Sequence, residues 1–466
     1  MRPARRHALA VIGAAVLLGA AALGTWSIME NGPTRVGGHV ATSVAAGRNR
    51  VQPGPPNSST VRSPPRWEVG WGSAMAWGYQ TVTDATVRTL VDIPVDSLAL
   101  RVRISNQFGK APLTVGAASV GRSTAGAAVD AHSLHRLRFA GQDSTVVPAG
   151  GWALSDPVAL PSNAPQMLAV SVFVTGSNLI SSHYPCCEAS TPSFLSTPGS
   201  GNLTGAASAA GFGYRAPWSR LVDAVDVQRP APPAGHATEP GSIVVLGDSI
   251  TDGFNSAARW TDLLQARIQA LPVFERPPVV NEAITANTLT AVTPNYSASG
   301  GGPPGVDRLT YDALSFPGVA TVVVFLGTND LYFGASAASV VDGLSQAAAA
   351  AHASGARVVA VTLTPRMGSE GWSPARQAEL DQVNHWMGET QAFDGVINFY
   401  AALADVYNGS CQPASMFPAL DSGDHLHPNA TGAAVMADAI DPAVLGVPPL
   451  PAVPVSVNLT PVPGCA

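Results

Sequence analysis

The hydrophobic pattern of the chain changes at a proline-rich segment near its middle, residues 229–241, and this change limits what the chain can fold into. The segment reads RPAPPAGHATEPG, and proline at this density interrupts helices and strands. Before it, apolar residues alternate with polar ones in short runs, whereas after it they form unbroken runs. At roughly 150 residues per domain, a chain of 466 residues is too long for one ordinary core. We therefore expect two folded domains, joined by a linker over residues 229–241.

Residues 67–228 carry the pattern of an all-β domain. The runs at 98–104 and 167–174 alternate with period two, turn residues punctuate the region, and no convincing long helix interrupts it. This pattern predicts a β-sandwich or jelly roll. Arg101 and Arg103 fall on the same face of the first run. We expect that face to be solvated, with a ligand-binding face as the alternative.

Residues 242–447 carry the pattern of an α/β domain. The fully apolar run at 243–246 and the largely apolar runs at 321–326 and 357–363 predict buried parallel strands, and the alanine-rich stretch at 336–354 predicts a helix. Strands that alternate with helices in this way form a mostly parallel sheet with helices on both faces. The expected architecture is a three-layer α/β/α domain preceded by the all-β domain.

The N-terminus has the order of an export signal. Three arginines within the first six residues precede an uncharged run over residues 8–29. Because the run is also long enough to span a bilayer, residues 1–29 are read as either a cleaved signal peptide or a retained signal anchor. In both cases we expect the rest of the chain outside the cytoplasm, secreted or anchored to the cell membrane. Residues 30–66 hold few large apolar side chains, which predicts a disordered Gly/Pro/Ser linker.

The four cysteines are Cys186, Cys187, Cys411 and Cys465, and in an oxidising compartment they favour a disulfide. Four cysteines allow three pairings. Adjacent cysteines do not easily reach disulfide geometry with each other, so we favour a bridge from Cys411 to Cys465. Such a bridge would tie the Pro-rich tail, residues 448–466, to the last domain. No pair of cysteines has the spacing typical of zinc ligands.

The charge balance argues against nucleic acid as a partner. The chain has 25 basic and 31 acidic residues, a net charge of −6, and no long run of either sign. Phosphate binding needs a basic patch, and the sequence offers none.

Three polar segments follow or flank the predicted strands of the α/β domain. The first strand runs into Gly-Asp-Ser, which places Ser249 at the carboxyl edge of the sheet, where ligands collect in such folds. A simple helix N-cap is the alternative role for this serine. The second strand delivers Asn329 and Asp330 to the same edge. Asp424 and His427 lie three residues apart in a later turn, where the carboxylate can fix the imidazole tautomer and leave its other nitrogen to deprotonate a serine.

These segments, together with the block NEAITAN at residues 281–287, resemble the SGNH (GDSL-type) hydrolase family. The resemblance covers residues 243–439. The β region, through residues 71–73 and 101–106, also looks like the sandwich domain that precedes the catalytic domain in exported bacterial members of this group.

The resemblance implies a role for each matching residue. Ser249 matches the nucleophile, and Asp424 and His427 match the pair that activates it. The oxyanion donors would be the backbone N–H groups of Ser249 and Ala286 and the side-chain amide of Asn329. Such a site forms an acyl-enzyme that water then hydrolyses.

The family has glycine where this chain has Ala286. Alanine keeps the N–H group, so the donor survives if the backbone there avoids positive φ and is misdirected if the position needs a glycine-only conformation. Losing one such donor costs about 10² to 10³ in rate. Asn287 follows as in many family members, and Asp248 and Asp330 are interpreted as supporting carboxylates. His425 falls off the family pattern and is interpreted as a neighbour of the base.

We expect an exported serine esterase that hydrolyses carboxylic esters without a metal or organic cofactor. A β-sandwich attached to an exported esterase favours a polymer as binding partner, so deacylation of a carbohydrate is the leading expectation. Trp71, Trp77 and Trp218 of the β region can stack on sugar rings or fill the core, and we favour the core for each.

Three other functions remain open at this stage. A lipase or lysophospholipase of the same mechanism is favoured by the membrane anchor, if the anchor is retained. A catalytically weakened glycan-binding cell-surface protein is the second, with Ala286 marking a lost site. The third is a metal-dependent hydrolase with Asp424, His425 and His427 as ligands, although no H-E-x-x-H motif accompanies them.

Overall fold

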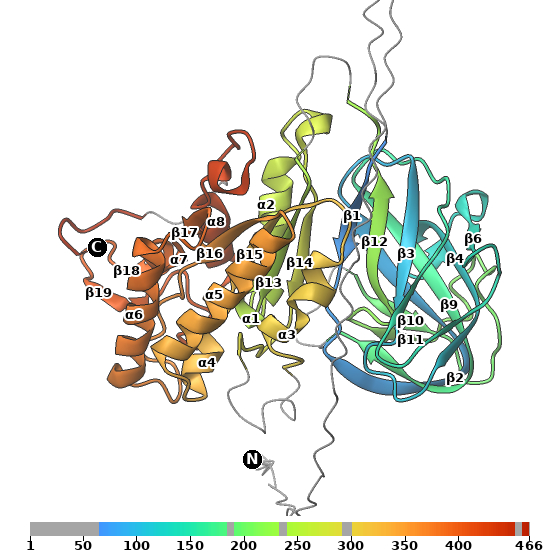
Figure 1. Cartoon of the computed structure of the whole chain (residues 1–466), viewed down its shortest axis with the longest axis horizontal. Helices are drawn as coiled ribbons and strands as arrows, with labels where there is room; N and C mark the ends of the chain where they lie inside the picture. Colours follow the sequence, from blue (N-terminus) through green and yellow to red (C-terminus); the bar gives the residue numbers. More distant parts are fainter. Residues whose placement is uncertain (1–64, 184–190, 233–239, 291–300, 453–458, 466) are drawn as a thin grey trace, which may run out of the picture. The chain divides into compact units, whose positions relative to one another are not determined.

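The computed structural model describes residues 65–183, 191–232, 240–290, 301–452 and 459–465 (Figure 1). These residues all belong to one compact unit of the chain. The predicted export segment, nearly all of the predicted disordered linker, Cys186 and Cys187 lie outside the described residues. Within the described part of the chain, no helix has the length and apolar character needed to cross a membrane.

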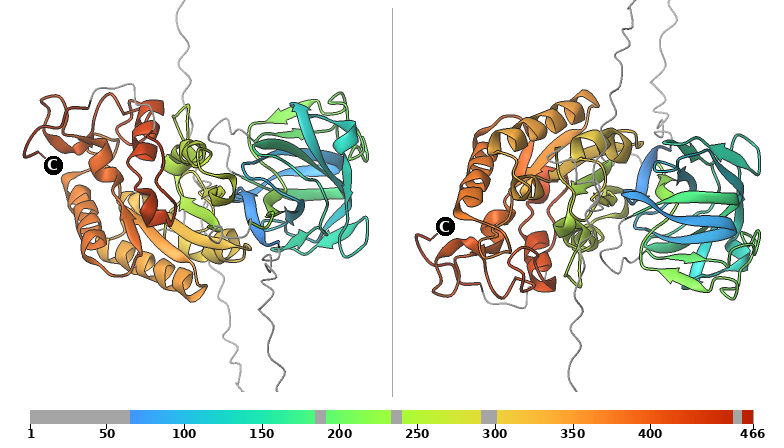
Figure 2. Two further views of the ribbon diagram at one scale, coloured as in Figure 1. Left: turned by 90° about the horizontal axis from the view of Figure 1, so that it is seen from above. Right: turned by 90° about the horizontal axis from the view of Figure 1, so that it is seen from below.

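The first half of the described chain forms two antiparallel sheets (Figure 2). The smaller sheet has the strand order β1-β12-β3-β8, and the larger has the order β11-β10-β2-β9-β4-β5 with β6 and β7 also paired to β4. The strands are β1 (Trp67–Gly72), β2 (Trp77–Ile93), β3 (Ala99–Ser105), β4 (Leu113–Ala125), β5 (Ala128–Val129), β6 (His135–Leu137), β7 (Thr145–Val147), β8 (Trp152–Leu154), β9 (Gln166–Ser182), β10 (Ser193–Leu195), β11 (Tyr214–Ala216) and β12 (Val222–Gln228). One short 3-10 helix, η1 (Ala131–Ser133), lies between β5 and β6.

The two sheets share one hydrophobic core. Val102 and Val225 come from the smaller sheet, and Val87, Val120 and Val172 come from the larger, all at most 1% exposed. Because side chains alternate between the faces of a strand, the period-two runs place these valines inward. The predicted β-sandwich is confirmed.

The strand face that carries Arg101 and Arg103 differs from expectation. We expected it to be solvated, but Arg103 is buried and its guanidinium lies 4.6 Å from the ring centroid of Tyr311 and 4.5 Å from that of Phe316. Arg103 Nε donates to Asp223 at 2.8 Å, and the Tyr311 hydroxyl donates to the same carboxylate at 3.0 Å. The prediction was wrong for Arg103, because residues of the second domain cover it, and strand periodicity does not reveal which residues another domain will cover. Arg101 stays partly exposed, with 23% of its side chain accessible, and pairs with Asp226 of the sandwich at 2.7 Å.

The second half of the described chain contains a five-stranded parallel sheet with the order β14-β13-β15-β16-β17. The strands are β13 (Ser242–Gly247), β14 (Val279–Ala283), β15 (Val319–Phe325), β16 (Arg357–Val361) and β17 (Gly395–Ile397). The three predicted apolar runs coincide with β13, β15 and β16, the central strands. Buried on both faces, these strands need apolar side chains at successive positions, which is why they read as unbroken runs.

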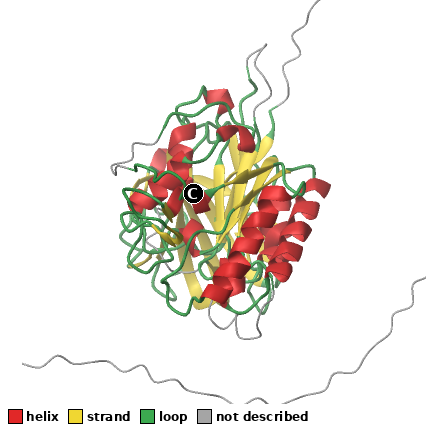
Figure 3. Ribbon diagram, turned by 90° about the vertical axis from the view of Figure 1, so that its left-hand side faces the viewer, coloured by secondary structure: helices red, strands yellow, loops and turns green. Residues whose placement is uncertain are grey.

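Helices cover both faces of this sheet, which gives the predicted three layers (Figure 3). On one face Val244 belongs to the same core cluster as Leu344, and on the other Val245 clusters with Leu264 and Met436. The α-helices are α1 (Ser249–Asp252), α2 (Trp260–Ile268), α3 (Gly305–Leu309), α4 (Thr328–Tyr332), α5 (Ala337–Ala353), α6 (Pro374–Glu389), α7 (Phe399–Leu403) and α8 (Ala430–Asp438). Shorter turns are η2 (Val273–Glu275), η4 (Thr310–Leu314) and η5 (Pro442–Leu445).

Capping side chains fix where the longer helices begin. Ser336 accepts a hydrogen bond from the N–H of Ser339 at the start of α5, and Asn429 accepts from Thr431 and Gly432 at the start of α8. These side chains satisfy N–H groups that have no partner within the helix. The predicted helix at 336–354 is therefore α5 with its two flanking residues.

The strand order brings three loops together at the carboxyl edge of the sheet. From β13 the chain passes to β14 on one side, and it then returns to form β15 on the other. Ligands bind at such a reversal of strand order in open α/β sheets. The segments that follow β13, β14 and β15 therefore meet at this point.

Contacts of single described residues hold each of the two chain segments that flank the α/β domain, while residues 233–239 of the predicted linker and residues 453–458 and 466 of the tail lie outside the described residues. Arg229, the first residue of the predicted linker, is buried and donates to Glu68 at 2.7 Å. The predicted disulfide between Cys411 and Cys465 is confirmed. It ties the tail to the segment between β18 (Ala404–Asp405) and β19 (Gln412–Met416).

Candidate active site

Ser249 is the first residue of α1, directly after the carboxyl end of β13. Asp248, and not Ser249, caps the helix, because its Oδ1 accepts the N–H of Ile250 at 3.0 Å. Gly247 allows the tight turn, since a Cβ there would lie 2.4 Å from the Cβ of Thr251. The Ser249 side chain is therefore free of a capping role and lines a cavity.

Ser249, His427 and Asp424 form a continuous line of hydrogen-bonded groups. The Oγ of Ser249 lies 2.8 Å from His427 Nε2, and His427 Nδ1 lies 2.7 Å from Asp424 Oδ2. An ionised carboxylate can only accept, so Nδ1 carries the proton and Nε2 is left to accept from the serine hydroxyl. The structure thus brings together three residues that the sequence predicted from separate segments.

The turn that holds His427 also keeps Asp424 charged. Asp424 Oδ1 accepts the N–H groups of Leu426 at 3.0 Å and His427 at 2.8 Å, and Oδ2 accepts from Asn255 Nδ2 at 2.9 Å. Burial opposes the charged form, but the hydrogen bonds from His427 and Leu426 outweigh it and lower the pKa of Asp424 well below its ordinary value. Asp424 is therefore a fixed negative charge behind the imidazole.

Ala286 adopts a left-handed conformation with a φ of 60°. The sequence left open whether the backbone at this position avoids positive φ or needs a conformation that only glycine adopts. The structure shows a positive φ in the αL region. Alanine reaches that region at a cost of about 1–2 kcal/mol. Neither Ala286 nor Ser249 uses its N–H in a backbone hydrogen bond to another described residue, and both residues line the same cavity. Both N–H groups are therefore available to a ligand there.

Asn329 lies in the first turn of α4 and lines the cavity beside Ser249. Its Nδ2 donates to the carbonyl of Asn287 at 2.9 Å and makes a longer contact of 3.5 Å with Asp248 Oδ2. The contact with Asn287 ties the loop after β14 to α4. The predicted oxyanion residues Ser249, Ala286 and Asn329 therefore line the same cavity.

The predicted supporting residues brace that loop. Asn287 Nδ2 donates to the carbonyl of Gly301 at 2.6 Å, and its Oδ1 accepts from Arg308 Nε at 3.0 Å. The Asp330 carboxylate accepts the N–H of Leu289 at 2.7 Å and both the N–H and the hydroxyl of Thr290, at 2.8 and 2.7 Å. These contacts fix the backbone on the C-terminal side of Ala286.

Asp248 is fully buried beneath the site. Burial raises its pKa to about 6, against the opposing influence of the Ile250 N–H, His427 and Arg366. The group touches the helix it caps and the Asn329 amide. Its position is that of a structural carboxylate.

A cavity of about 350 Å³ opens beside Ser249, and sequence reasoning missed several residues of its wall. Phe254, Tyr332, Phe333 and Arg366 line it together with the predicted site residues. The three aromatic residues lie within five positions of Ser249 or Asn329, and that proximity is the signal that could have found them. No comparable signal marks the arginine.

His425 takes no part in the site. Its Nδ1 lies 2.8 Å from Asp421, and its side chain is 53% exposed. His427 is paired with Asp424 instead. Among the described residues, no group of three or more His, Cys, Asp and Glu side chains is arranged to hold a metal ion.

Comparison with known proteins identifies the second domain. Residues 245–435 match the GDSL-like lipase/acylhydrolase family. No curated protein matches the chain by sequence. Similar solved structures include an acetylxylan esterase from Geobacillus stearothermophilus, with a sequence identity of 18% and a TM-score of 0.34. The match covers 45% of this chain and 96% of the esterase chain. A GDSL-like lipase from Bacteroides thetaiotaomicron is 17% identical over 45% of this chain and 92% of that chain, with a TM-score of 0.31. Over residues 245–435 the chain therefore carries a GDSL-like lipase/acylhydrolase domain of the SGNH hydrolases, enzymes that act on ester bonds.

Proposed function

We propose that this chain is an exported serine esterase in which Ser249 is the nucleophile. The observation that carries the proposal is the line of contacts from Ser249 Oγ to His427 Nε2, at 2.8 Å, and from His427 Nδ1 to Asp424, at 2.7 Å. An imidazole held by a fixed carboxylate can accept the serine proton as the hydroxyl attacks.

The reaction proceeds in two halves. Ser249 Oγ bonds to the ester carbonyl carbon while its proton moves to His427, and the developing oxyanion is held by the N–H groups of Ser249 and Ala286 and by the Asn329 amide. Collapse breaks the bond to the alcohol oxygen, which leaves with the proton from His427. Water then attacks the acyl-enzyme with His427 again as base, and the acid is released.

We propose an ester of a carbohydrate as the substrate. A cavity of about 350 Å³ suits a short acyl group, and its aromatic wall can stack on a sugar ring. A second support is an aromatic cluster on the sandwich, in which Tyr79 stacks on Trp77 at 5.7 Å and meets Trp218 at 5.9 Å between ring centroids. Tyr79 is 50% exposed and Tyr214 is 49% exposed. We expected three tryptophans in the core, but only Trp71 is buried there, whereas Trp77 and Trp218 are half-buried.

A lipase is the second candidate, and the apolar part of the cavity wall favours it. Phe254, Phe333 and Leu426 offer apolar surface close to Ser249. Burial of an acyl chain against such apolar surface is favourable.

Export is part of the proposal. The positively charged start followed by the apolar run over residues 8–29 supports it. The disulfide between Cys411 and Cys465 supports it too, because such bonds persist in oxidising compartments.

Hydrolysis of p-nitrophenyl acetate and of a longer-chain p-nitrophenyl ester tests the enzyme assignment. We expect hydrolysis by the chain from Trp67 onward, loss to background in Ser249→Ala, and no effect of a chelator. A Ser249→Ala variant that keeps the wild-type rate would refute the proposal. Faster turnover of the acetate supports the carbohydrate ester, and faster turnover of the longer ester supports the lipase.

Binding to insoluble polysaccharide tests the carbohydrate assignment separately. We expect Tyr79→Ala to weaken binding to the polysaccharide while hydrolysis of p-nitrophenyl acetate stays unchanged. The buried Trp71 is unsuitable for this test, because it packs in the sandwich core and its loss would destabilise the fold. Equal binding by wild type and Tyr79→Ala would remove the aromatic cluster from the proposal.

A further inference from the structure

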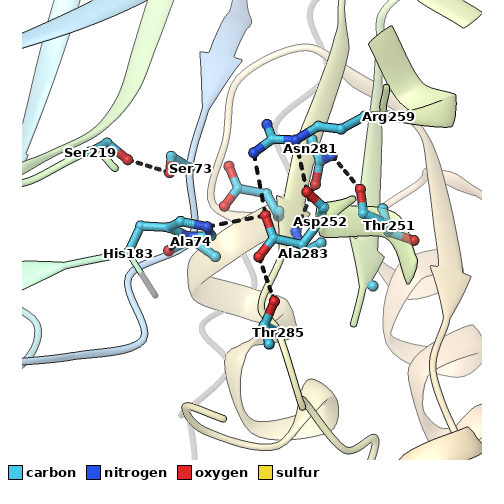
Figure 4. Close-up of polar contacts among 12 residues, drawn as sticks. Ser73, Ala74, His183, Ser219, Thr251, Asp252, Arg259, Asn281, Ala283 and Thr285 are labelled. Atoms are coloured by element: carbon cyan, nitrogen blue, oxygen red, sulfur yellow. Dashed lines mark hydrogen bonds and ion pairs between the residues drawn. The ribbon is translucent and has the colours of Figure 1, made fainter. Parts of the chain in front are cut away.

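His183, a residue of the sandwich, lies against the helix that begins at Ser249 (Figure 4). It follows the last residue of β9 and is buried. Its Nδ1 lies 2.8 Å from the carbonyl oxygen of Ala74, and its Nε2 lies 3.3 Å from Asp252 Oδ1. Asp252 is the last residue of α1, so the sandwich touches the nucleophile's own helix.

Both partners of the His183 ring are acceptors. A carbonyl oxygen and an ionised carboxylate cannot donate, so both contacts are hydrogen bonds only when both ring nitrogens carry protons. Arg259 also lies near this carboxylate, with Nη2 at 3.4 Å from Oδ1. Although burial opposes it, the electrostatic influence of His183 and Arg259 and the hydrogen bonds from His183 and Thr285 lower the pKa of Asp252. Asp252 is a buried anion between the two domains.

The other oxygen of Asp252 reaches the loop after β14. Thr285 Oγ1 donates to Asp252 Oδ2 at 2.8 Å, as Figure 4 shows. One carboxylate therefore joins three segments: the end of β9, helix α1 and the loop that contains Ala286.

Thr285 directly precedes Ala286, whose N–H is one of the predicted oxyanion donors. The N–H of Ala286 belongs to the peptide that begins at the carbonyl of Thr285, so the direction of that N–H follows the position of Thr285. Ala286 has a φ of 60°, which alanine does not prefer and which persists only where the surroundings hold it. On the preceding side, the N–H of Ile284 donates to the carbonyl of Gly247 at 3.0 Å. Thr285 lies between Ile284 and Ala286 in the chain, and its hydrogen bond to Asp252 holds the loop at this position.

We propose that His183 is a positioning residue for ester hydrolysis: acting through Asp252 and Thr285, it holds the Ala286 N–H in line with Ser249. The sandwich then completes the oxyanion site, in addition to any role in binding a polymer. This inference rests on the esterase function proposed above.

Replacing His183 by alanine in the full chain tests the proposal. We expect kcat for p-nitrophenyl acetate to fall about 10- to 100-fold with KM changed less than threefold, because a small displacement of one oxyanion donor weakens the transition state and leaves ground-state binding of a small ester in place. The rate at which a phosphonate inhibitor labels Ser249 is expected to fall in parallel, because its adduct also places an oxygen in the oxyanion site.

Tyr311→Phe is the matched control. Its hydroxyl makes a different contact between the same two domains, to Asp223 and Ser105, both at 3.0 Å. That contact does not lead to the loop of Ala286. We expect the variant to keep the wild-type kcat, so a loss shared by His183→Ala and Tyr311→Phe would mean that any weakening of the domain contact lowers activity, and the proposed route would be overturned.

A pair of variants at Thr285 separates positioning from folding. Thr285→Val keeps the shape and loses the hydroxyl, whereas Thr285→Ser keeps the hydroxyl. We expect Thr285→Val to lower kcat as His183→Ala does and Thr285→Ser to retain it. The double variant His183→Ala/Thr285→Val should lose no more than the larger single loss, because both changes break one chain of contacts. If the fold-losses of kcat in the two single variants multiply in the double variant, His183 and Thr285 act independently and the proposed chain of contacts is refuted.

The outcomes keep the two proposals apart. If wild type shows no Ser249-dependent hydrolysis and no phosphonate labelling, the esterase function fails and this inference fails with it. If wild type is active and His183→Ala has the kcat of wild type while its thermal unfolding shows a folded protein, only the role of His183 is refuted.

Discussion

The ring of Phe254 packs against the imidazole of His427, with ring centroids 4.7 Å apart and planes tilted by 53°. The Asp424 contact fixes one end of the imidazole, and this ring limits the sideways movement of the other. We expect Phe254→Ala to lower kcat for p-nitrophenyl acetate about tenfold, because misplacement of a catalytic group slows the chemical step. Phe254→Leu should lose less, since part of the contact remains. Steady-state kinetics on both variants checks this, and an unchanged kcat in Phe254→Ala would contradict it.

Ala286→Gly tests whether alanine limits the oxyanion site. Glycine adopts the observed φ of 60° without strain, so the folded state gains up to about 1–2 kcal/mol, and the more flexible unfolded chain offsets about 0.4–1 kcal/mol of it. We expect unchanged or slightly raised stability and a kcat within threefold of wild type. Ala286→Val, which is β-branched and strained at positive φ, should lower kcat more than tenfold. Equal activity of the valine variant would show that this backbone position is unimportant.

Asp248→Asn tests the buried carboxylate through the pH dependence of stability. Burial raises the pKa of Asp248 from its ordinary 3.8 to about 6, so the folded state binds the proton more tightly than the unfolded state does. Between about pH 4 and pH 6, wild type therefore loses stability as pH rises, by up to roughly 3 kcal/mol. Asparagine keeps the capping acceptor and does not titrate. Urea unfolding should show the variant gaining stability relative to wild type from pH 4 to pH 7, and a pH-independent difference would contradict the assignment.

Asp330→Ala tests the hydrogen bonds that hold the loop on the C-terminal side of Ala286. It removes the acceptor for the N–H groups of Leu289 and Thr290, and leaving such buried groups unpaired costs about 1–3 kcal/mol each. We expect a lower urea midpoint together with a reduced kcat. Loss of stability without any change in kcat would show that the loop keeps its geometry without this carboxylate.

Removing the disulfide tests the role of the tail. Cys411 and Cys465 are 54 residues apart, and a bridge of that span stabilises a fold by roughly 2–4 kcal/mol. The double variant Cys411→Ala/Cys465→Ala should unfold at a lower urea concentration and keep its kcat, because neither residue lines the cavity beside Ser249. A lower kcat measured under conditions where the variant is fully folded would show that the tail affects the active site.

The sequence was sufficient for the features that local patterns encode. The strands β13, β15 and β16 are largely apolar, and Ser249 and Asn329 come within four residues of the ends of two of them, so their meeting at one edge could be predicted from chain order. Asp424 and His427 are three residues apart, which made their contact predictable as well.

Features that depend on contacts between distant segments could not be predicted in this way. Arg103 looks like a solvated residue on an alternating strand, and only the second domain buries it. His183 and Asp252 are 69 residues apart in different domains, and neither stands in a pattern that points to the other. For Ala286 the sequence left two conformations open, since φ depends on how neighbouring segments hold the loop.

The buried junction of Arg103, Asp223 and Tyr311 makes each domain specific for the other. An exchange of genes that joined the hydrolase domain to an unrelated sandwich would leave the Tyr311 hydroxyl without its carboxylate, and the reverse exchange would leave Arg103 without its aromatic cover. Each domain therefore supplies a partner that the other needs, and a substitution on one side of the junction is expected to require a matching substitution on the other.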